Sequence, residues 1–251
     1  MENKTDAQNY YGSLCAEMYE KLHQEAPENE LAFYLSYAEP GMRVLEPLCG
    51  SGRFLVPFEQ RGFDITGVDL SREMLDKLKE KSPDAKVFLA DATQCPDAGP
   101  FDYIFIPSGS MSLFTDEETC REMLLAMRAM LAPQGVFVFS VDTVNSIRRT
   151  DEPVIDAQVD MGPGKTLVLK STYSFDDEAK VQMAPGLYEL WEKETLIRSE
   201  TMDFRIRLYE MGEMERLLAE AGFSSVRAYS SFEKTEALDN SCECFIYECR
   251  I

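Results

Sequence analysis

Five short β-prone runs alternate with helical segments between residues 42 and 142, and this alternation constrains the fold more strongly than any other feature. The runs are Arg43–Leu45, Ile65–Asp69, Lys86–Leu89, Tyr103–Ile106 and Val136–Val141. Strands separated by helices pair in parallel, because each helix crosses back over one face of the sheet. The pattern therefore predicts a doubly wound α/β sheet with helices on both faces.

The chain changes character after Asp142. Residues 143–164 are rich in Asp, Pro and Gly, which predicts a loop, and the β-prone stretches over 166–209 predict an antiparallel meander. Three further elements are expected: a helix over Gly212–Ala221 that stops before Gly222, and strands over Ser225–Tyr229 and Cys244–Glu248. The expected fold is a Rossmann-like, mostly parallel seven-stranded sheet with an antiparallel β insertion between the fifth strand and the following helix.

Capping residues predict where two of the helices begin. Ser71 can cap a helix whose first turn contains Glu73. Thr115 and Glu118 have the spacing of a capping box ahead of an apolar helical stripe. We therefore expect helices to start directly after Ser71 and Thr115.

The chain is strongly acidic. Its 25 Lys and Arg residues against 45 Asp and Glu residues give a net charge of −20 over 251 residues. Such a surface repels phosphate backbones and anionic lipids, so nucleic acids and membranes are not expected partners. No apolar run approaches the roughly 20 residues that cross a bilayer, and the polar N-terminus has no signal-peptide core. These features predict a cytoplasmic protein whose partner is a neutral or cationic molecule.

Cysteine and histidine usage gives no indication of a metal centre. The seven cysteines are an odd number, which argues against a disulfide framework. Cys242, Cys244 and Cys249 form the one suggestive cluster, but on a regular strand Cys249 faces away from the other two. We expect them to be core or strand-end residues, and we expect the single histidine, His23, to lie on a surface helix.

A glycine-rich turn follows the first strand, within residues 42–55. The strand ends in Glu46, and Gly50 and Gly52 allow backbone N–H groups to approach a ligand closely. A dinucleotide fingerprint would need a third glycine where Leu55 stands. A phosphate-binding loop would need its first glycine where Val159 stands, so neither nucleotide motif matches.

Four segments in order resemble the motifs of class I S-adenosyl-L-methionine (SAM)-dependent methyltransferases. They are VLEPLCGSGRF at the first turn, GVDLSREML at 67–75, ADA at 90–92 and FDYIFIPSGSMS at 101–112. The resemblance covers residues 42–142 and the last helix and two strands. It implies a methyltransferase that uses SAM and releases S-adenosyl-L-homocysteine (SAH). One position departs from the motif, because Leu48 replaces the first family glycine, and we expect a modest reshaping of the turn there.

The resemblance also implies which residues hold the cofactor. Asp69, at the end of the second strand, would accept hydrogen bonds from the ribose hydroxyls, in the manner of acids in dinucleotide sites. Gly50 and Gly52 would lie beside the methionine end, with Glu46 ordering the turn or reaching the ammonium group through water. The residues expected around the adenine and the methyl donor are Leu70, Met74, Asp91, Ala92 and Ser108.

The acceptor side is expected near the N-terminal helix and the insertion. Tyr11 and Ser108 are the catalytic candidates. The candidate acceptor-binding residues are Tyr11, Tyr19, Ser110, Tyr188, Trp191 and Arg205. Ordinary packing on a sheet face is an equally simple role for the aromatic residues among them.

Three regions follow from this interpretation. Residues 1–40 form a helical cover, residues 41–149 and 210–251 form the SAM-binding domain, and residues 150–209 form a β-rich substrate lid or dimer contact. The expected activity is methyl transfer to an N, O or S atom of a small molecule, by a monomer or a homodimer. The alternatives are a protein or peptide methyltransferase and a non-catalytic SAM sensor.

Overall fold

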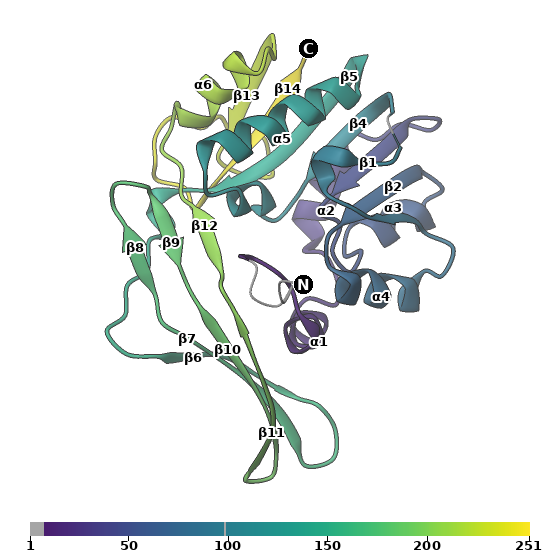
Figure 1. Cartoon of the computed structure of the whole chain (residues 1–251). Helices are drawn as coiled ribbons and strands as arrows, with labels where there is room; N and C mark the ends of the chain where they lie inside the picture. Colours follow the sequence, from purple (N-terminus) through teal and green to yellow (C-terminus); the bar gives the residue numbers. More distant parts are fainter. Residues whose placement is uncertain (1–7, 98) are drawn as a thin grey trace.

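The computed structural model describes residues 8–97 and 99–251, so the first seven residues of the expected N-terminal cover lie outside it. A layered α/β body carries a long β arm, and the helix α1 (Ser13–Leu22) lies between them (Figure 1). The arm is the insertion that follows the fifth strand.

The body is built on a seven-stranded sheet with the order β13-β14-β5-β4-β1-β2-β3. Its strands are β1 (Arg43–Pro47), β2 (Asp64–Asp69), β3 (Lys86–Leu89), β4 (Phe101–Ile106), β5 (Leu131–Asp142), β13 (Ser225–Tyr229) and β14 (Cys244–Arg250). β1 to β5 are parallel, and β14 is antiparallel to both β5 and β13. The seven-stranded, mostly parallel sheet predicted from the sequence is confirmed.

Helices cover both faces of this sheet (Figure 1). They are α2 (Glu28–Leu35), α3 (Leu55–Gln60), α4 (Arg72–Lys81), α5 (Glu117–Met130) and α6 (Glu213–Glu220). Alternate residues of β4 enter different core clusters: Ile104 and Ile106 pack with α5 and α6, whereas Tyr103 and Phe105 pack with α2, α3 and α4. This two-sided burial explains why the parallel strands are almost continuously apolar.

One of the two predicted helix caps is confirmed. The Ser71 hydroxyl accepts a hydrogen bond from the backbone N–H of Met74 at 3.1 Å, and α4 begins at the next residue. Thr115 is not a cap, because the carboxylate of Asp116 accepts from the N–H groups of Glu118 and Thr119 at 2.9 and 3.1 Å. A carboxylate one residue later satisfies the free N–H groups of α5 more strongly than the threonine hydroxyl.

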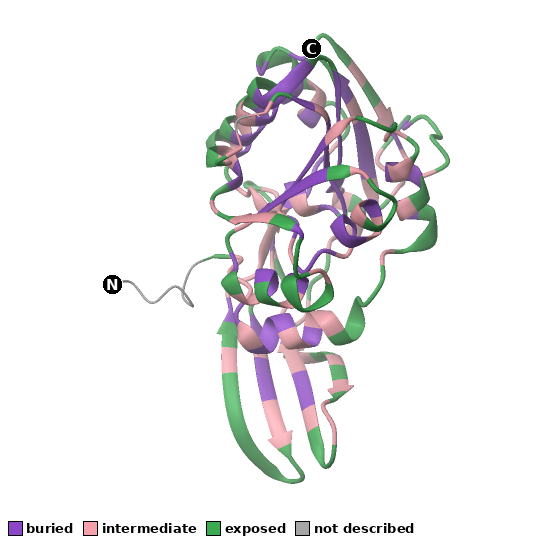
Figure 2. Ribbon diagram, turned by 90° about the vertical axis from the view of Figure 1, so that its right-hand side faces the viewer, coloured by how far each residue is buried: buried purple, intermediate pink, exposed green. Residues whose placement is uncertain are grey.

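The insertion differs from the single meander that the sequence predicted. It forms a four-stranded sheet in the order β11-β10-β7-β6 and a separate three-stranded sheet in the order β12-β9-β8. Its strands are β6 (Val154–Asp160), β7 (Lys165–Ser171), β8 (Ser174–Asp176), β9 (Val181–Met183), β10 (Gly186–Glu192), β11 (Thr195–Met202) and β12 (Arg205–Arg207). The loop prediction for 143–164 was wrong over β6, an edge strand that is mostly exposed and so lacks an apolar alternation. Across the whole arm, exposed and half-buried residues are more frequent than in the sheet of the body (Figure 2).

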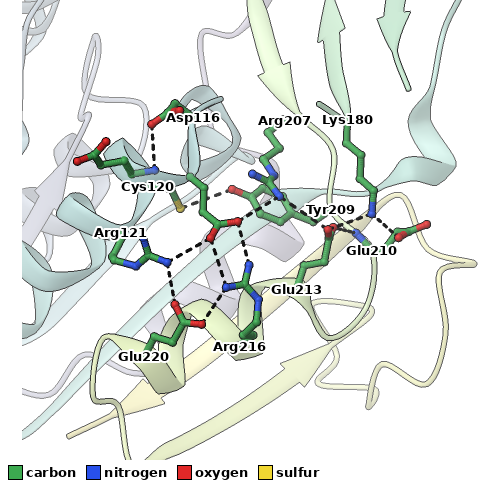
Figure 3. Close-up of polar contacts among 12 residues, drawn as sticks. Asp116, Cys120, Arg121, Lys180, Arg207, Tyr209, Glu210, Glu213, Arg216 and Glu220 are labelled. Carbon is green, nitrogen blue, oxygen red and sulfur yellow. Dashed lines mark hydrogen bonds and ion pairs between the residues drawn. The ribbon is translucent and has the colours of Figure 1, made fainter. Parts of the chain in front are cut away.

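Charged side chains fix the base of the insertion to the body (Figure 3). Arg207 of β12 and Lys180 both lie close to Glu213 of α6, at 3.7 and 3.0 Å. Arg216 joins α6 to Glu117 of α5 at 2.9 Å. A single exposed ion pair contributes little, but a network that joins α5, α6, β12 and the turn before β9 restrains how the arm can tilt.

Gly52 is a position where an added methyl group should destabilise the fold. Its φ is +80°, and a Cβ there would approach Leu78 Cγ to 2.8 Å. We expect Gly52→Ala to lower the free energy of unfolding by more than about 1 kcal/mol, measured by urea denaturation. Gly62→Ala is the matched control, because Gly62 has φ +83° with open space around its Cβ position. Equal losses in the two variants would show that the Leu78 contact costs nothing.

Candidate functional site

A cavity of about 290 Å³ opens at the carboxyl ends of β1, β2 and β4, beneath the segment that leads into α1. This edge of a doubly wound sheet is where such folds bind ligands. The lining residues are Gln8, Asn9, Tyr10, Tyr11, Tyr19, Glu46, Leu48, Cys49, Gly50, Arg53, Phe54, Asp69, Leu70, Ser71, Met74, Pro107, Ser108, Ser110, Leu113 and Phe114.

The turn after β1 has left-handed backbone at three positions. Leu48, Gly50 and Gly52 have φ values of +59°, +52° and +80°. The expected reshaping at Leu48 does not remove the positive φ, and a leucine in this conformation costs about 1–2 kcal/mol. Its side chain lines the cavity and packs against the core beside α5, which offsets part of that cost.

Asp69 orders this turn with its carboxylate. One oxygen accepts the N–H of Gly50 and the other accepts the N–H of Ser71, both at 2.8 Å. Burial raises the pKa of Asp69, and these N–H groups oppose that shift by stabilising the charged form. Each carboxylate oxygen has a further lone pair for a ligand hydroxyl.

Glu46 and Arg53 place a carboxyl group and a guanidinium on the cavity wall. Among the described residues, Oε2 of Glu46 and Nε of Arg53 are buried without a hydrogen-bond partner. Burial raises the pKa of Glu46 well above its usual range, although the positive charge of Arg53 lowers it in part. Buried polar atoms without a partner are costly, so these two atoms point to a ligand that carries both a cationic and an anionic group.

Sequence analysis missed Arg53 and Glu30. The Arg53 guanidinium donates to the Ser108 hydroxyl and lies 5.2 Å from the ring centre of Phe54. Glu30, only 6% exposed, accepts the N–H of Ser108 at 2.8 Å and holds this residue at a positive φ of +58°. Arg53 follows Gly52 directly in the motif, so its position was a usable signal, whereas Glu30 comes from a helix with no motif.

Comparisons with known proteins agree with this geometry. A family model described as a methyltransferase domain matches residues 44–135. The chain is 24% identical to YqeM of Bacillus subtilis (strain 168), itself only provisionally named a methyltransferase, over 88% of the chain and 90% of YqeM. Residues 44–135 are thus a methyltransferase domain, of the class I SAM-dependent type.

Solved structures of methyltransferases share the whole fold. One is an S-adenosylmethionine-dependent methyltransferase from Clostridium acetobutylicum ATCC 824, with a TM-score of 0.76 at 16% identity, covering 94% of this chain and 97% of the other. Another is the sugar N-methyltransferase KedS8 from Streptoalloteichus sp ATCC 53650, with a TM-score of 0.74 at 20% identity over 94% and 92% of the two chains. At these identities the likeness establishes the fold.

The cavity of this methyltransferase includes six of the nine expected cofactor residues. They are Glu46, Gly50, Asp69, Leu70, Met74 and Ser108. Gly52 lies behind the turn against Leu78, and Ala92 is buried in the core. Asp91 caps a short 3₁₀ turn by accepting from the N–H and hydroxyl of Thr93 at 2.8 and 2.7 Å. None of these three is among the residues that line the cavity.

The expected acceptor residues divide into two groups. Tyr11, Tyr19 and Ser110 line the cofactor cavity, and Tyr188 lines a second cavity with Tyr11 and Tyr19. The indole N–H of Trp191 donates to Glu189, and the Arg205 guanidinium donates twice to Asp203, at 2.9 and 2.8 Å. These last two side chains lie outside the linings of both cavities.

Hydrogen bonds hold the segment before α1 over the cavity. The Asn9 side chain donates to the carbonyl groups of Leu113 and Arg205, at 3.1 and 2.8 Å, and accepts the N–H of Arg205 at 2.8 Å. The Tyr10 hydroxyl donates to Glu73 at 2.7 Å. The cover is thus attached both to the body and to the insertion.

The C-terminal cysteines lie on two sides of the central sheet. Cys249 is buried beside α5 and α6, with Cys242 packed against the same cluster, and Cys244 packs on the opposite side. Pairing Cys242 with Cys244 on one face was therefore wrong, because Cys242 precedes β14 and does not follow strand alternation. Across residues 8–97 and 99–251, no group of three or more His, Cys, Asp or Glu side chains is arranged to hold a metal ion.

His23 lies at the C-terminal end of α1, where it is exposed and lines the second cavity. Burial of part of its ring and the charge of Arg53 lower its pKa.

Within the described part of the chain, no helix is both long enough and apolar enough to cross a bilayer.

Proposed function

We propose that this methyltransferase binds SAM in the cavity beside β1 and β2 and transfers its methyl group to an N, O or S atom of a small molecule. The observation that carries the proposal is the pair of buried, unpartnered atoms on Glu46 and Arg53, set beside Asp69 in one cavity. This arrangement fits a nucleoside with a zwitterionic amino-acid end. Its ammonium would meet Glu46, its carboxylate would meet Arg53, and its ribose would meet Asp69.

Apolar side chains fit the remaining part of the cofactor. Leu70 is 55% exposed although it lines the cavity, and Met74 lies next to it on the first turn of α4. These two side chains would pack against the faces of the adenine ring. A flat ring that covers exposed apolar surface removes it from water, and this burial stabilises the bound state.

The contribution of the protein to the reaction is alignment. Bound SAM supplies a methyl group on a sulfonium, which is already a good leaving group. The covering segment with Tyr10 and Tyr11 excludes water, and the turn with Ser108 limits where an acceptor can approach. Holding two reactants in line can lower a barrier by roughly 7–11 kcal/mol.

The covered cavities support a small acceptor over a protein or peptide acceptor. Asn9 ties the covering segment to both the body and the insertion, so a polypeptide acceptor would have to pass a tethered segment to reach the cofactor cavity. The sugar N-methyltransferase KedS8 has the same fold.

We assign residues 41–149 and 210–251 to cofactor binding, 1–40 to the cover and 150–209 to the lid, in a monomer or homodimer. All seven cysteines are free thiols, which fits the cytoplasm.

Two measurements on the purified protein test this proposal. Calorimetric titration with SAH should show one site per chain. Incubation with SAM and a mixture of small amines, thiols and phenols should release SAH above the rate without acceptors. Failure of SAH to bind would contradict the cofactor assignment, whereas binding without release across broad mixtures would favour the non-catalytic sensor.

A further inference from the structure

A second cavity of about 400 Å³ lies under α1, between this helix and the strands β7 and β10 of the insertion. Tyr11 and Tyr19 line both this cavity and the cofactor cavity. Their rings stand edge to face with centres 6.2 Å apart. The two cavities therefore share one wall, formed by these two tyrosines.

Apolar surface forms much of the second cavity, although polar groups of Tyr11, Tyr19, His23 and Ser171 also line it. Met18 of α1 is 2% exposed, and Leu169, Met202 and Phe204 face it from the insertion. The hydroxyl of Tyr188 already donates to the thiol of Cys15 at 3.2 Å. Burial raises the pKa of that thiol to about 12, so this wall carries no charge.

The arginine and the aspartate of the lining lie together. Arg148 forms an ion pair with Asp156 at 3.5 Å, and its guanidinium lies 3.7 Å from the ring centre of Tyr173. The Asp156 side chain is only 16% exposed. Arg148 is the one Arg or Lys among the described lining residues, and its charge is balanced within the wall.

We propose that this second cavity is the methyl-acceptor site and that it takes an uncharged, predominantly apolar ring compound with one nucleophilic hydroxyl or amine. The proposal rests on the proposed function, because the nucleophile must face the methyl donor past Tyr11 and Tyr19. The opposite end of the molecule would carry a hydrogen-bonding group that meets Arg148, Asp156 and Tyr173. A cavity of this volume matches a drug-sized molecule of one to three rings.

The same charges argue against a phosphorylated or nucleotide-linked acceptor. A phosphate needs free cationic donors, and the Arg148 guanidinium is already paired with Asp156. The net charge of −20 opposes the approach of any polyanion. The lining favours a neutral acceptor over an anionic one of the same shape.

The acceptor class can be tested with a matched pair of probes on SAH-loaded protein. Calorimetry should show that 2-naphthol binds at least about tenfold more tightly than 2-naphthyl phosphate. In Asp156→Asn, where the charge of Arg148 is no longer balanced, this preference should fall several-fold or reverse. Three results would overturn the proposal. The wild type could bind 2-naphthyl phosphate as tightly as 2-naphthol or more tightly, or it could show no measurable binding of 2-naphthol up to the solubility limit. The ratio of the two dissociation constants could also be the same in Asp156→Asn as in the wild type.

The location of the site needs a variant that fills the cavity. Ala184 lines it and is 7% exposed, so Ala184→Phe should weaken 2-naphthol binding at least about tenfold while SAH binding stays within about twofold. Thr201→Phe, on the exposed edge strand β11, is the control. Unchanged 2-naphthol binding in Ala184→Phe would overturn the location. If Ala184→Phe does not fold, the ratio of the dissociation constants of the two naphthyl probes in Asp156→Asn still tests the proposal. If the wild-type protein does not bind SAH at all, that result would instead contradict the proposed function.

Discussion

Replacing Asp69 with alanine should weaken the binding of SAM and SAH more than tenfold, a change of about 1.4 kcal/mol. The carboxylate has two roles at the cavity. It accepts the N–H groups of Gly50 and Ser71, both at 2.8 Å, and each of its oxygens has a further lone pair that could accept a ribose hydroxyl. Alanine removes both the order of the turn and the acceptors for the sugar, and calorimetric titration with SAH measures the combined loss.

A ligand lacking the sugar hydroxyls separates the two roles. The wild type should bind SAH more tightly than its 2′,3′-dideoxy analogue, whereas Asp69→Ala should bind the two about equally. Asp64→Ala, at the exposed start of the same strand, should leave both affinities unchanged. If Asp69→Ala still discriminates between the ligands as strongly as the wild type does, Asp69 orders the turn without contacting the ribose.

Local sequence pattern was sufficient for the body of the protein. Each parallel strand is a short apolar run bounded by a polar turn, and burial on both faces makes such runs easy to find. The left-handed turn at Gly50 and Gly52 was likewise visible, because glycine accepts positive φ where most residues do not. Asp69 could be placed at the cavity because the carboxyl ends of parallel strands meet at one edge of the sheet.

Features that depend on distant contacts were not visible in the sequence. Glu30 reaches Ser108 across 78 positions of the chain, and nothing near Glu30 indicates that its carboxylate is buried. β6 pairs with β7 as an exposed edge strand, so its residues show no apolar alternation. Leu48 shows the same limit: the surrounding turn imposes a backbone conformation that the residue itself disfavours.

Arg53 is the residue that should distinguish the amino-acid end of the cofactor from the nucleoside. It is the one Arg or Lys among the described residues that line the cofactor cavity, and its Nε is buried without a partner. A hydrogen bond between charged groups contributes roughly 1.5–3 kcal/mol, so Arg53→Met should weaken SAH binding by about tenfold or more. The affinity for 5′-methylthioadenosine, which has no carboxylate, should change by less than about twofold.

The comparison between these two ligands separates recognition from a structural role. Arg53 also donates to Ser108 and stacks beside Tyr19 and Phe54, so removing it could loosen the cavity as a whole. A loosened cavity would lower the affinity for both ligands alike, and such a result would refute a contact between Arg53 and the carboxylate of SAH. Arg61→Met serves as the control, because Arg61 lies outside the cavity lining and donates to the carbonyl of Pro57 at 2.7 Å. A loss confined to SAH and to Arg53→Met would therefore place the carboxylate of the cofactor beside this guanidinium.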